Sequence, residues 1–162
     1  MNMFKRIVCG LLAALLLAAC AAPGQSVAAP DSAVEFVDVQ GAQVALQSWD
    51  RVVSLYGSFA ELWLLSGGTL VGATTDAVEE RGLALGDNVA LVGNVKTPGL
   101  EEVLALRPDF VILSADIEGH VALDESLTAA GVPHAYFRVD NFEDYCTVLR
   151  QFCSLTGRDD LF

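Results

Sequence analysis

The sequence predicts an α/β domain with a mainly parallel sheet flanked by helices. Short apolar runs rich in β-branched residues, such as 51–55 and 110–113, are typical of strands buried on both faces. Segments with helical signals separate these runs, and they are bounded by Gly or Pro. Strands that alternate with helices along a chain favour a parallel sheet with helices on both of its faces.

The predicted strands begin with a small N-terminal β-hairpin, in which two alternating segments flank Gly41. Later strands are short and uniformly apolar. Together the predicted strands span 34–39, 43–47, 51–55, 69–74, 89–92, 110–113 and 134–139.

The predicted helices carry recognisable start and stop signals. Ser58 is an N-cap candidate for a helix over 59–65 that Gly67-Gly68 stops, and Thr97-Pro98 provides a cap and first position for a helix that Pro108 ends. A third helix spans 121–130. Asn141 caps a longer fourth helix, with Asp144 three residues on.

Ligands of parallel α/β sheets bind outside the carboxyl ends of the strands. The loops expected there are 56–58, 74–76, 93–97, 114–119 and 138–141. Their polar and aromatic residues are the candidate ligand-binding set: Tyr56, Ser58, Thr75, Asp76, Asn94, Lys96, Asp116 and Arg138.

Each candidate also has a purely structural interpretation. Tyr56 could pack locally at its strand end instead of stacking on a ligand ring. Arg138 could pair with Asp140 or Asp116 instead of an anionic ligand, and the loop polar residues could simply cap turns. Trp63, inside a short apolar helix, is expected in the core.

The first residues predict export and lipid anchoring. Lys5 and Arg6 precede an apolar run over 7–17, which suits a signal peptide and is too short for a transmembrane helix. Leu17-Ala18-Ala19-Cys20 resembles the lipobox of bacterial lipoproteins, which makes Cys20 the lipidated residue. We therefore expect a signal peptide over 1–19 and a flexible tether over 20–32.

Composition excludes several classes of function. The net charge is −12, and loss of Lys5 and Arg6 with the signal peptide would make it two charges more negative, which argues against nucleic acid as a partner. No nucleophile elbow, P-loop or dinucleotide fingerprint is present, so we expect no enzyme and no cofactor. His120 and His134 lack ligand partners at helical spacing, so no metal site is expected.

Two further cysteines, Cys146 and Cys153, are expected to be structural. Cys146 and Cys153 lie seven positions apart on a predicted helix, about 10.5 Å along its axis. A disulfide needs Cα atoms within about 7 Å, so we expect both to be free core residues.

The stretch 98–112, Pro-Gly-Leu-Glu-Glu-Val-Leu-Ala-Leu-Arg-Pro-Asp-Phe-Val-Ile, carries a family resemblance. Together with the hairpin and the following strand, it resembles the class III (helical-backbone) substrate-binding proteins of ABC importers, which take up ferric siderophores, haem or cobalamin. The resemblance implies a Rossmann-like N-terminal lobe over 33–140 and the start of a long interlobe helix over 141–162. It also implies a second lobe, absent here, so we expect a truncated product or a fragment.

The resemblance assigns Glu101 to docking on the permease, since a glutamate of the family's Leu-Glu motif meets permease arginines. The alternative is that Glu101, like Glu102, merely favours the positive end of its helix. The expected function is capture of an iron chelate, haem or corrinoid by a protein lipid-anchored to the outer face of the cell membrane, or to its periplasmic side in a Gram-negative host. The alternative is a one-lobed surface lipoprotein that acts as a protein-interaction module.

Overall fold

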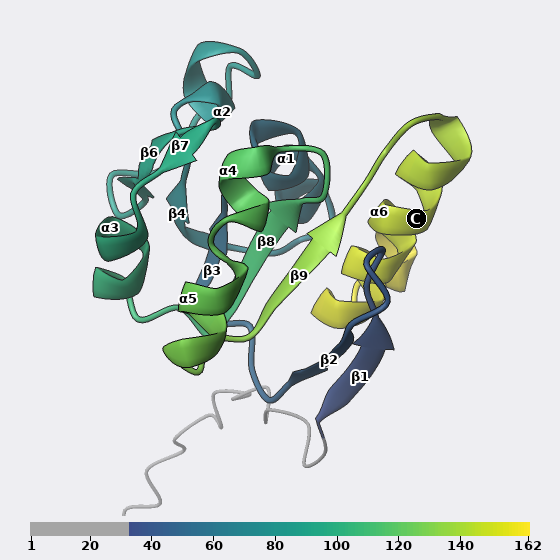
Figure 1. Ribbon diagram of the computed structural model, residues 1–162. Coiled ribbons are helices and arrows are strands. Elements are labelled where there is room, and N and C mark those ends of the chain that lie inside the picture. The colour runs from purple at the N-terminus through teal and green to yellow at the C-terminus, as the bar shows by residue number, and fades with distance from the viewer. Residues whose placement is uncertain (1–32) are drawn as a thin grey trace, which may run out of the picture.

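A computed structural model describes residues 33–162, and its centre is a five-stranded parallel sheet (Figure 1). All four strand pairings are parallel, and the spatial order is β5-β4-β3-β8-β9. The strands are β3 (Val52–Ser54), β4 (Leu70–Ala73), β5 (Ala90–Leu91), β8 (Phe110–Ser114) and β9 (His134–Phe137). The predicted fold class, a mainly parallel sheet flanked by helices, is confirmed.

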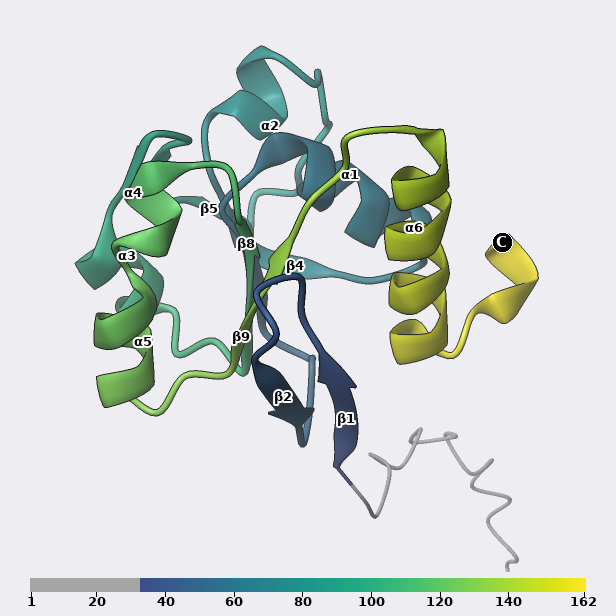
Figure 2. The ribbon, with the colours of Figure 1, turned by 45° about the vertical axis from the view of Figure 1, so that its right-hand side comes forward.

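Helices cover both faces of this sheet, as Figure 2 shows. Successive strand residues point to opposite faces, so the apolar runs supply two cores. One core joins Val52, Ile112 and Phe137 to α1 (Gly57–Leu65) and α6 (Phe142–Thr156). The other joins the alternate strand residues to α3 (Leu100–Ala105) and α5 (Asp124–Ala129).

Trp63 lies in the first core, as predicted. Its ring meets those of Phe110 and Phe152 edge to face, with centroids 6.2 and 5.3 Å apart. Its indole N–H donates to the carbonyl of Thr69 at 2.8 Å, which satisfies the only polar group of a fully buried side chain. Gly68 must stay small, because a Cβ there would lie 2.4 Å from the indole.

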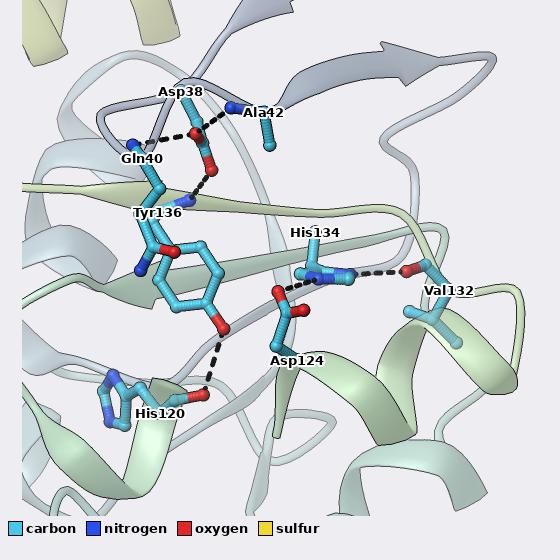
Figure 3. Close-up of polar contacts among 8 residues, drawn as sticks. All are labelled: Asp38, Gln40, Ala42, His120, Asp124, Val132, His134 and Tyr136. Carbon is cyan, nitrogen blue, oxygen red and sulfur yellow. Dashed lines mark hydrogen bonds and ion pairs between the residues drawn. The ribbon is translucent and has the colours of Figure 1, made fainter. Parts of the chain in front are cut away.

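The predicted N-terminal hairpin is confirmed as β1 (Val34–Val37) and β2 (Gln43–Leu46). Asp38 ends β1 and is buried; its Oδ1 accepts from the backbone N–H groups of Gln40 and Ala42 (Figure 3). Its Oδ2 accepts from the N–H of Tyr136 at 3.1 Å, and the N–H of Val39 donates to the Tyr136 carbonyl. The hairpin turn therefore occupies free backbone groups of β9, an edge strand that would otherwise invite pairing with other chains.

A second hairpin corrects the predicted start of the second helix. Thr97 and Pro98 are not cap and first position; they form β7 (Thr97–Pro98), which pairs with β6 (Gly93–Asn94). The cap of α3 is Gly99. The Asn94 side chain closes the turn, since its Oδ1 accepts from the N–H groups of Lys96 and Thr97 at 2.9 and 3.0 Å.

The connection from α3 to β8 is held in place by two charged side chains, Arg51 and Asp109. Arg51 donates from its guanidinium to the carbonyl of Leu106, at the end of α3. The carboxylate of Asp109 accepts from the backbone N–H groups of Asp50 and Arg51, both at 2.9 Å. These contacts align the beginnings of β3 and β8, which are neighbours in the sheet.

Two other helix predictions need correction, and one helix was not predicted. Helix α1 begins at Gly57 with Tyr56 as its N-cap, so Ser58 lies inside the helix. A short helix, α2 (Asp76–Glu79), was not predicted. The helix expected over 121–130 is two helices, α4 (Glu118–Val121) and α5, which leave Ala122 and Leu123 between them.

Helix α6 has the predicted cap, because the Asn141 side chain accepts from the N–H groups of Glu143 and Asp144. The segment 141–162 is nevertheless not one helix. Gly157 adopts a φ of 69°, a left-handed conformation that ends α6, and the chain continues into η1 (Asp159–Leu161). Since Val148, Phe152 and Leu155 are buried in the first core, α6 belongs to this lobe.

Cys146 and Cys153 of α6 are both free, as expected, and burial raises the pKa of the Cys153 thiol. The longest described helix is α6, with 15 residues. None of the helices within 33–162 combines the length and the hydrophobicity required to cross a bilayer.

The two histidines bind backbone and side-chain groups of the fold. His134 lies between the carbonyl of Val132, 2.8 Å from Nδ1, and the carboxylate of Asp124, 3.1 Å from Nε2 (Figure 3). His120, on α4, is fully buried. Its Nδ1 accepts from the N–H of Ser114 at 3.0 Å, and its Nε2 lies 2.8 Å from the carbonyl of Val95.

His120 therefore holds three parts of the lobe together: the end of β8, the β6–β7 turn and, through its own carbonyl, the hydroxyl of Tyr136 on β9. One ring nitrogen accepts and the other donates, which is the pattern of a neutral imidazole. Burial lowers the pKa of His120 from its ordinary value of 6.5, against weaker raising contributions from Val95 and Asp76.

We predict that His120 stays neutral at pH values where an exposed histidine is protonated. The unfolded chain binds this proton more readily than the folded chain, so the free energy of unfolding should decrease as pH falls below 6.5. The decrease is at most about 1.4 kcal/mol per pH unit for one proton, and it ends below the lowered pKa of the folded state.

Ring resonances of the two histidines can be followed by NMR against pH and assigned with His120→Gln. The titration midpoint of the His120 signal should lie below 6.5. In urea unfolding, the variant should lose the decrease in the free energy of unfolding that His120 causes below pH 6.5. A titration midpoint at or above 6.5 would contradict the assignment of a neutral, hydrogen-bonded imidazole to His120.

Candidate ligand-binding site

A pocket of about 270 Å³ lies at the carboxyl edge of the central strands. The loop after β3 and the first turns of α1 form one side, and the loop after β8 forms the other. Arg81 comes from the segment after α2, and Tyr145 from α6. The lining residues are Tyr56, Ser58, Phe59, Glu61, Leu62, Arg81, Ser114, Asp116, Ile117, Val139 and Tyr145.

Three of the predicted ligand-binding residues line this pocket: Tyr56, Ser58 and Asp116. Tyr56 is half-buried and its ring meets that of Phe59 edge to face, with centroids 5.1 Å apart. The local-packing interpretation of Tyr56 is therefore correct for one edge of its ring, while the residue still contributes to the pocket surface.

Asp76 does not line the pocket; it fixes the helix that does. Its carboxylate is buried, and Oδ2 accepts from the N–H of Gly57, the first residue of α1, at 2.7 Å. Gly57 has no room for a Cβ, which would lie 2.8 Å from that oxygen and from the backbone N of Ala77. A carboxylate at the positive end of α1 stabilises the helix start and so positions Tyr56 and Ser58 on either side of Gly57.

The other predicted residues are divided between neighbouring surfaces. Thr75 is the N-cap of α2, and Asn94 closes the β6–β7 turn. Lys96 lines a separate groove of about 560 Å³ between that turn and α4, which shares Asp116 and Ile117 with the pocket. Gly119 permits this close approach, because a Cβ there would lie 1.9 Å from the Lys96 carbonyl oxygen.

Two ion pairs carry the charge of the pocket rim. Arg138 donates from Nε to Asp116 Oδ1 at 2.7 Å, the salt bridge foreseen as the alternative for Arg138. Arg81 donates to Glu61, with Nε 3.0 Å from Oε2. Each hydrogen-bonded carboxylate raises the pKa of its arginine.

Sequence reasoning missed Glu61, Arg81 and Tyr145. Arg81 lies on a loop that follows α2, and nothing in its local pattern places it beside α1. Tyr145 is on the inner face of α6, where helical periodicity indicates core packing. Its ring stacks on that of the exposed Phe142, with an angle of 8° between the rings.

Glu101 is exposed in the first turn of α3, beside Glu102. It forms no ion pair with any residue of 33–162. An unpaired carboxylate on the surface satisfies the geometric requirement for docking, and it equally satisfies the helix-dipole alternative.

No group of three or more His, Cys, Asp or Glu side chains within the described residues is arranged to hold a metal ion. The pocket offers aromatic and aliphatic surface from Tyr56, Ile117, Val139 and Tyr145, with ion pairs at its rim. Neither His120 nor His134 is among the lining residues.

Comparisons with solved structures identify the same fold. SirA of Staphylococcus aureus in complex with staphyloferrin B is 19% identical, with a TM-score of 0.59, over 79% of this chain and 44% of that one. The heme binding protein HmuT is 23% identical, with a TM-score of 0.62, over 83% and 44%. A periplasmic solute binding protein from Veillonella parvula is 21% identical, with a TM-score of 0.64, over 80% and 43%.

The chain thus spans less than half of the length of each of these solved structures. No curated protein matches the sequence. A family model described as periplasmic binding protein matches residues 52–161, which is most of the chain. Such proteins are exported and bind solutes without being enzymes, which confirms the predicted non-enzymatic class. From the parallel sheet, the pocket at its carboxyl edge and this match, we conclude that the chain belongs to the periplasmic binding protein family.

Proposed function

We propose that this protein captures an iron chelate, haem or a corrinoid and delivers it to the permease of an ABC importer. The observation that carries the proposal is the pocket at the carboxyl edge of the sheet, where aromatic and aliphatic side chains surround paired charges. Ligands with large planar or apolar faces suit such a surface. The ligands of two similar structures, staphyloferrin B for SirA and heme for HmuT, support the same class.

The described lobe supplies one wall of the proposed site. A pocket of about 270 Å³ is small for a siderophore or macrocycle, since ligand sites of drug-sized molecules usually have about 300–1,000 Å³. The matching structures are more than twice as long as the segments they share with this chain. We propose that the ligand lies between this wall and a second lobe.

Docking on the permease is assigned to Glu101. Its carboxylate is exposed and has no ion-pair partner within the described residues, so it remains accessible to a cationic surface. A charge-assisted pair between carboxylate and arginine would orient the protein on its partner.

Anchoring at the membrane is assigned to Cys20. This residue, the signal peptide over 1–19 and the tether over 20–32 lie outside the described residues, so their support is the sequence pattern alone. A tether that keeps the lobe near the permease raises its effective concentration there.

Ligand capture can be measured by quenching of tryptophan fluorescence with haem, cyanocobalamin and ferric chelates. We expect saturable quenching by at least one of these classes. Tyr56→Ala should weaken that binding about two- to twelvefold, because one aromatic contact is worth about 0.5–1.5 kcal/mol. Leu91→Ala is the control, since Leu91 is exposed on β5 and lines no pocket described here. Absence of quenching by all three classes, both for this chain and for a version extended by the proposed second lobe, would exclude the proposed ligands.

Docking can be measured as ligand uptake by cells that produce Glu101→Arg. Charge reversal should reduce the uptake rate at least about tenfold, because the lost attraction becomes repulsion, while the affinity for ligand stays constant. Glu125→Arg, which reverses an exposed charge in the first turn of α5, should leave uptake unchanged. Normal uptake with Glu101→Arg would exclude the docking role.

Anchoring can be measured by phase partitioning of cell extracts and by the mass of the N-terminal peptide. The native protein should partition with detergent and carry acyl chains on Cys20. Cys20→Ala should remove both properties, because the thiol is the proposed attachment point. A variant that still partitions with detergent would show that the lipobox interpretation is wrong.

A further inference from the structure

Both arginines at the pocket rim are already paired with carboxylates of the same wall. Arg81 binds Glu61, and Arg138 binds Asp116. The four side chains are between 34% and 51% exposed, so they are accessible from solvent. Three of them, Glu61, Arg81 and Asp116, line the pocket directly.

The charges of these four side chains sum to zero, and the direct lining of the pocket has one more acid than base. Arg81 donates to Glu61 from Nε and Nη2, so an anionic ligand could still reach its remaining N–H groups, but only with the Glu61 carboxylate beside it. The repulsion by that carboxylate offsets the attraction to the guanidinium. The whole chain carries a charge of −12, which further opposes the approach of an anion.

The uncharged part of the lining is extensive by comparison. Phe59, Leu62, Ile117 and Val139 are apolar lining residues, and Tyr56 and Tyr145 add aromatic side chains. Burial of apolar surface favours binding whatever the charge of the ligand.

We infer that this wall binds its ligand by shape and apolar contact, and that it selects an uncharged metal chelate over an anionic one of similar size. The inference rests on the proposed function, and it narrows the ligand class of the same site. The internal pairing of the rim arginines is the feature that sets the preference.

The test compares two gallium(III) chelates, because Ga(III) is diamagnetic and matches the charge of Fe(III). A trihydroxamate complex has no net charge, and a tricatecholate complex has a net charge of −3. Each is titrated into residues 20–162 while the amide NMR signals of 56–58 and 114–117 are followed. We expect the trihydroxamate to bind at least about tenfold more tightly, with a difference that decreases as salt screens the charges.

A pair of variants isolates the rim pairing from the overall charge. Glu61→Gln frees Arg81 and should shift the ratio of the two affinities about fivefold or more toward the tricatecholate. Glu125→Gln makes the same change in net charge on α5, outside the pocket, and should have a much smaller effect.

Tighter binding of the tricatecholate to the native chain would overturn the inference and leave the proposed function in place. Equal effects of Glu61→Gln and Glu125→Gln would overturn the role of the rim pairs. Shifts from neither chelate, together with absent quenching by haem and cyanocobalamin, would overturn the proposed function itself.

Discussion

Burial of a short parallel sheet on both faces is the constraint on which the rest of this structure depends. Every central strand must be apolar on both sides, and helices must follow each strand to cover it. Val52 and Val53, adjacent in the chain, consequently belong to different cores. The hairpin β1–β2 covers one sheet edge through Asp38 (Figure 3). The carboxyl edge is where the connecting loops gather, and the pocket lies there.

Polar groups at that edge are occupied mainly with holding the loops in place. Asp76 accepts from the start of α1, Asn94 closes the β6–β7 turn, and His120 binds Ser114 and the Val95 carbonyl. Buried backbone donors and acceptors must find such partners, because unpaired ones cost about 1–3 kcal/mol each. A polar residue in a loop near a binding site is thus often part of the support on which the site is built.

The surface that remains for a ligand is aromatic and aliphatic, with its charges paired. In the proposed capture of a metal chelate, apolar contact area supplies the affinity. The ion pairs at the rim favour an uncharged ligand over an anionic one. It also separates the roles of different carboxylates: Glu61 and Asp116 neutralise arginines, Asp76 positions a helix, and Glu101 stays free on the surface.

The sequence by itself determined the α/β class, the hairpin, most strand positions and the Asn141 cap, because these follow from local periodicity and from side chains that bind their own neighbours. It also located the loops of the site and three pocket residues. Only the tertiary structure decided which loop residues support the fold, and that Arg81 and Tyr145 join the pocket. Those assignments depend on contacts between segments far apart in the chain, such as Arg81 with Glu61 and Asp38 with Tyr136, and no local pattern records such contacts.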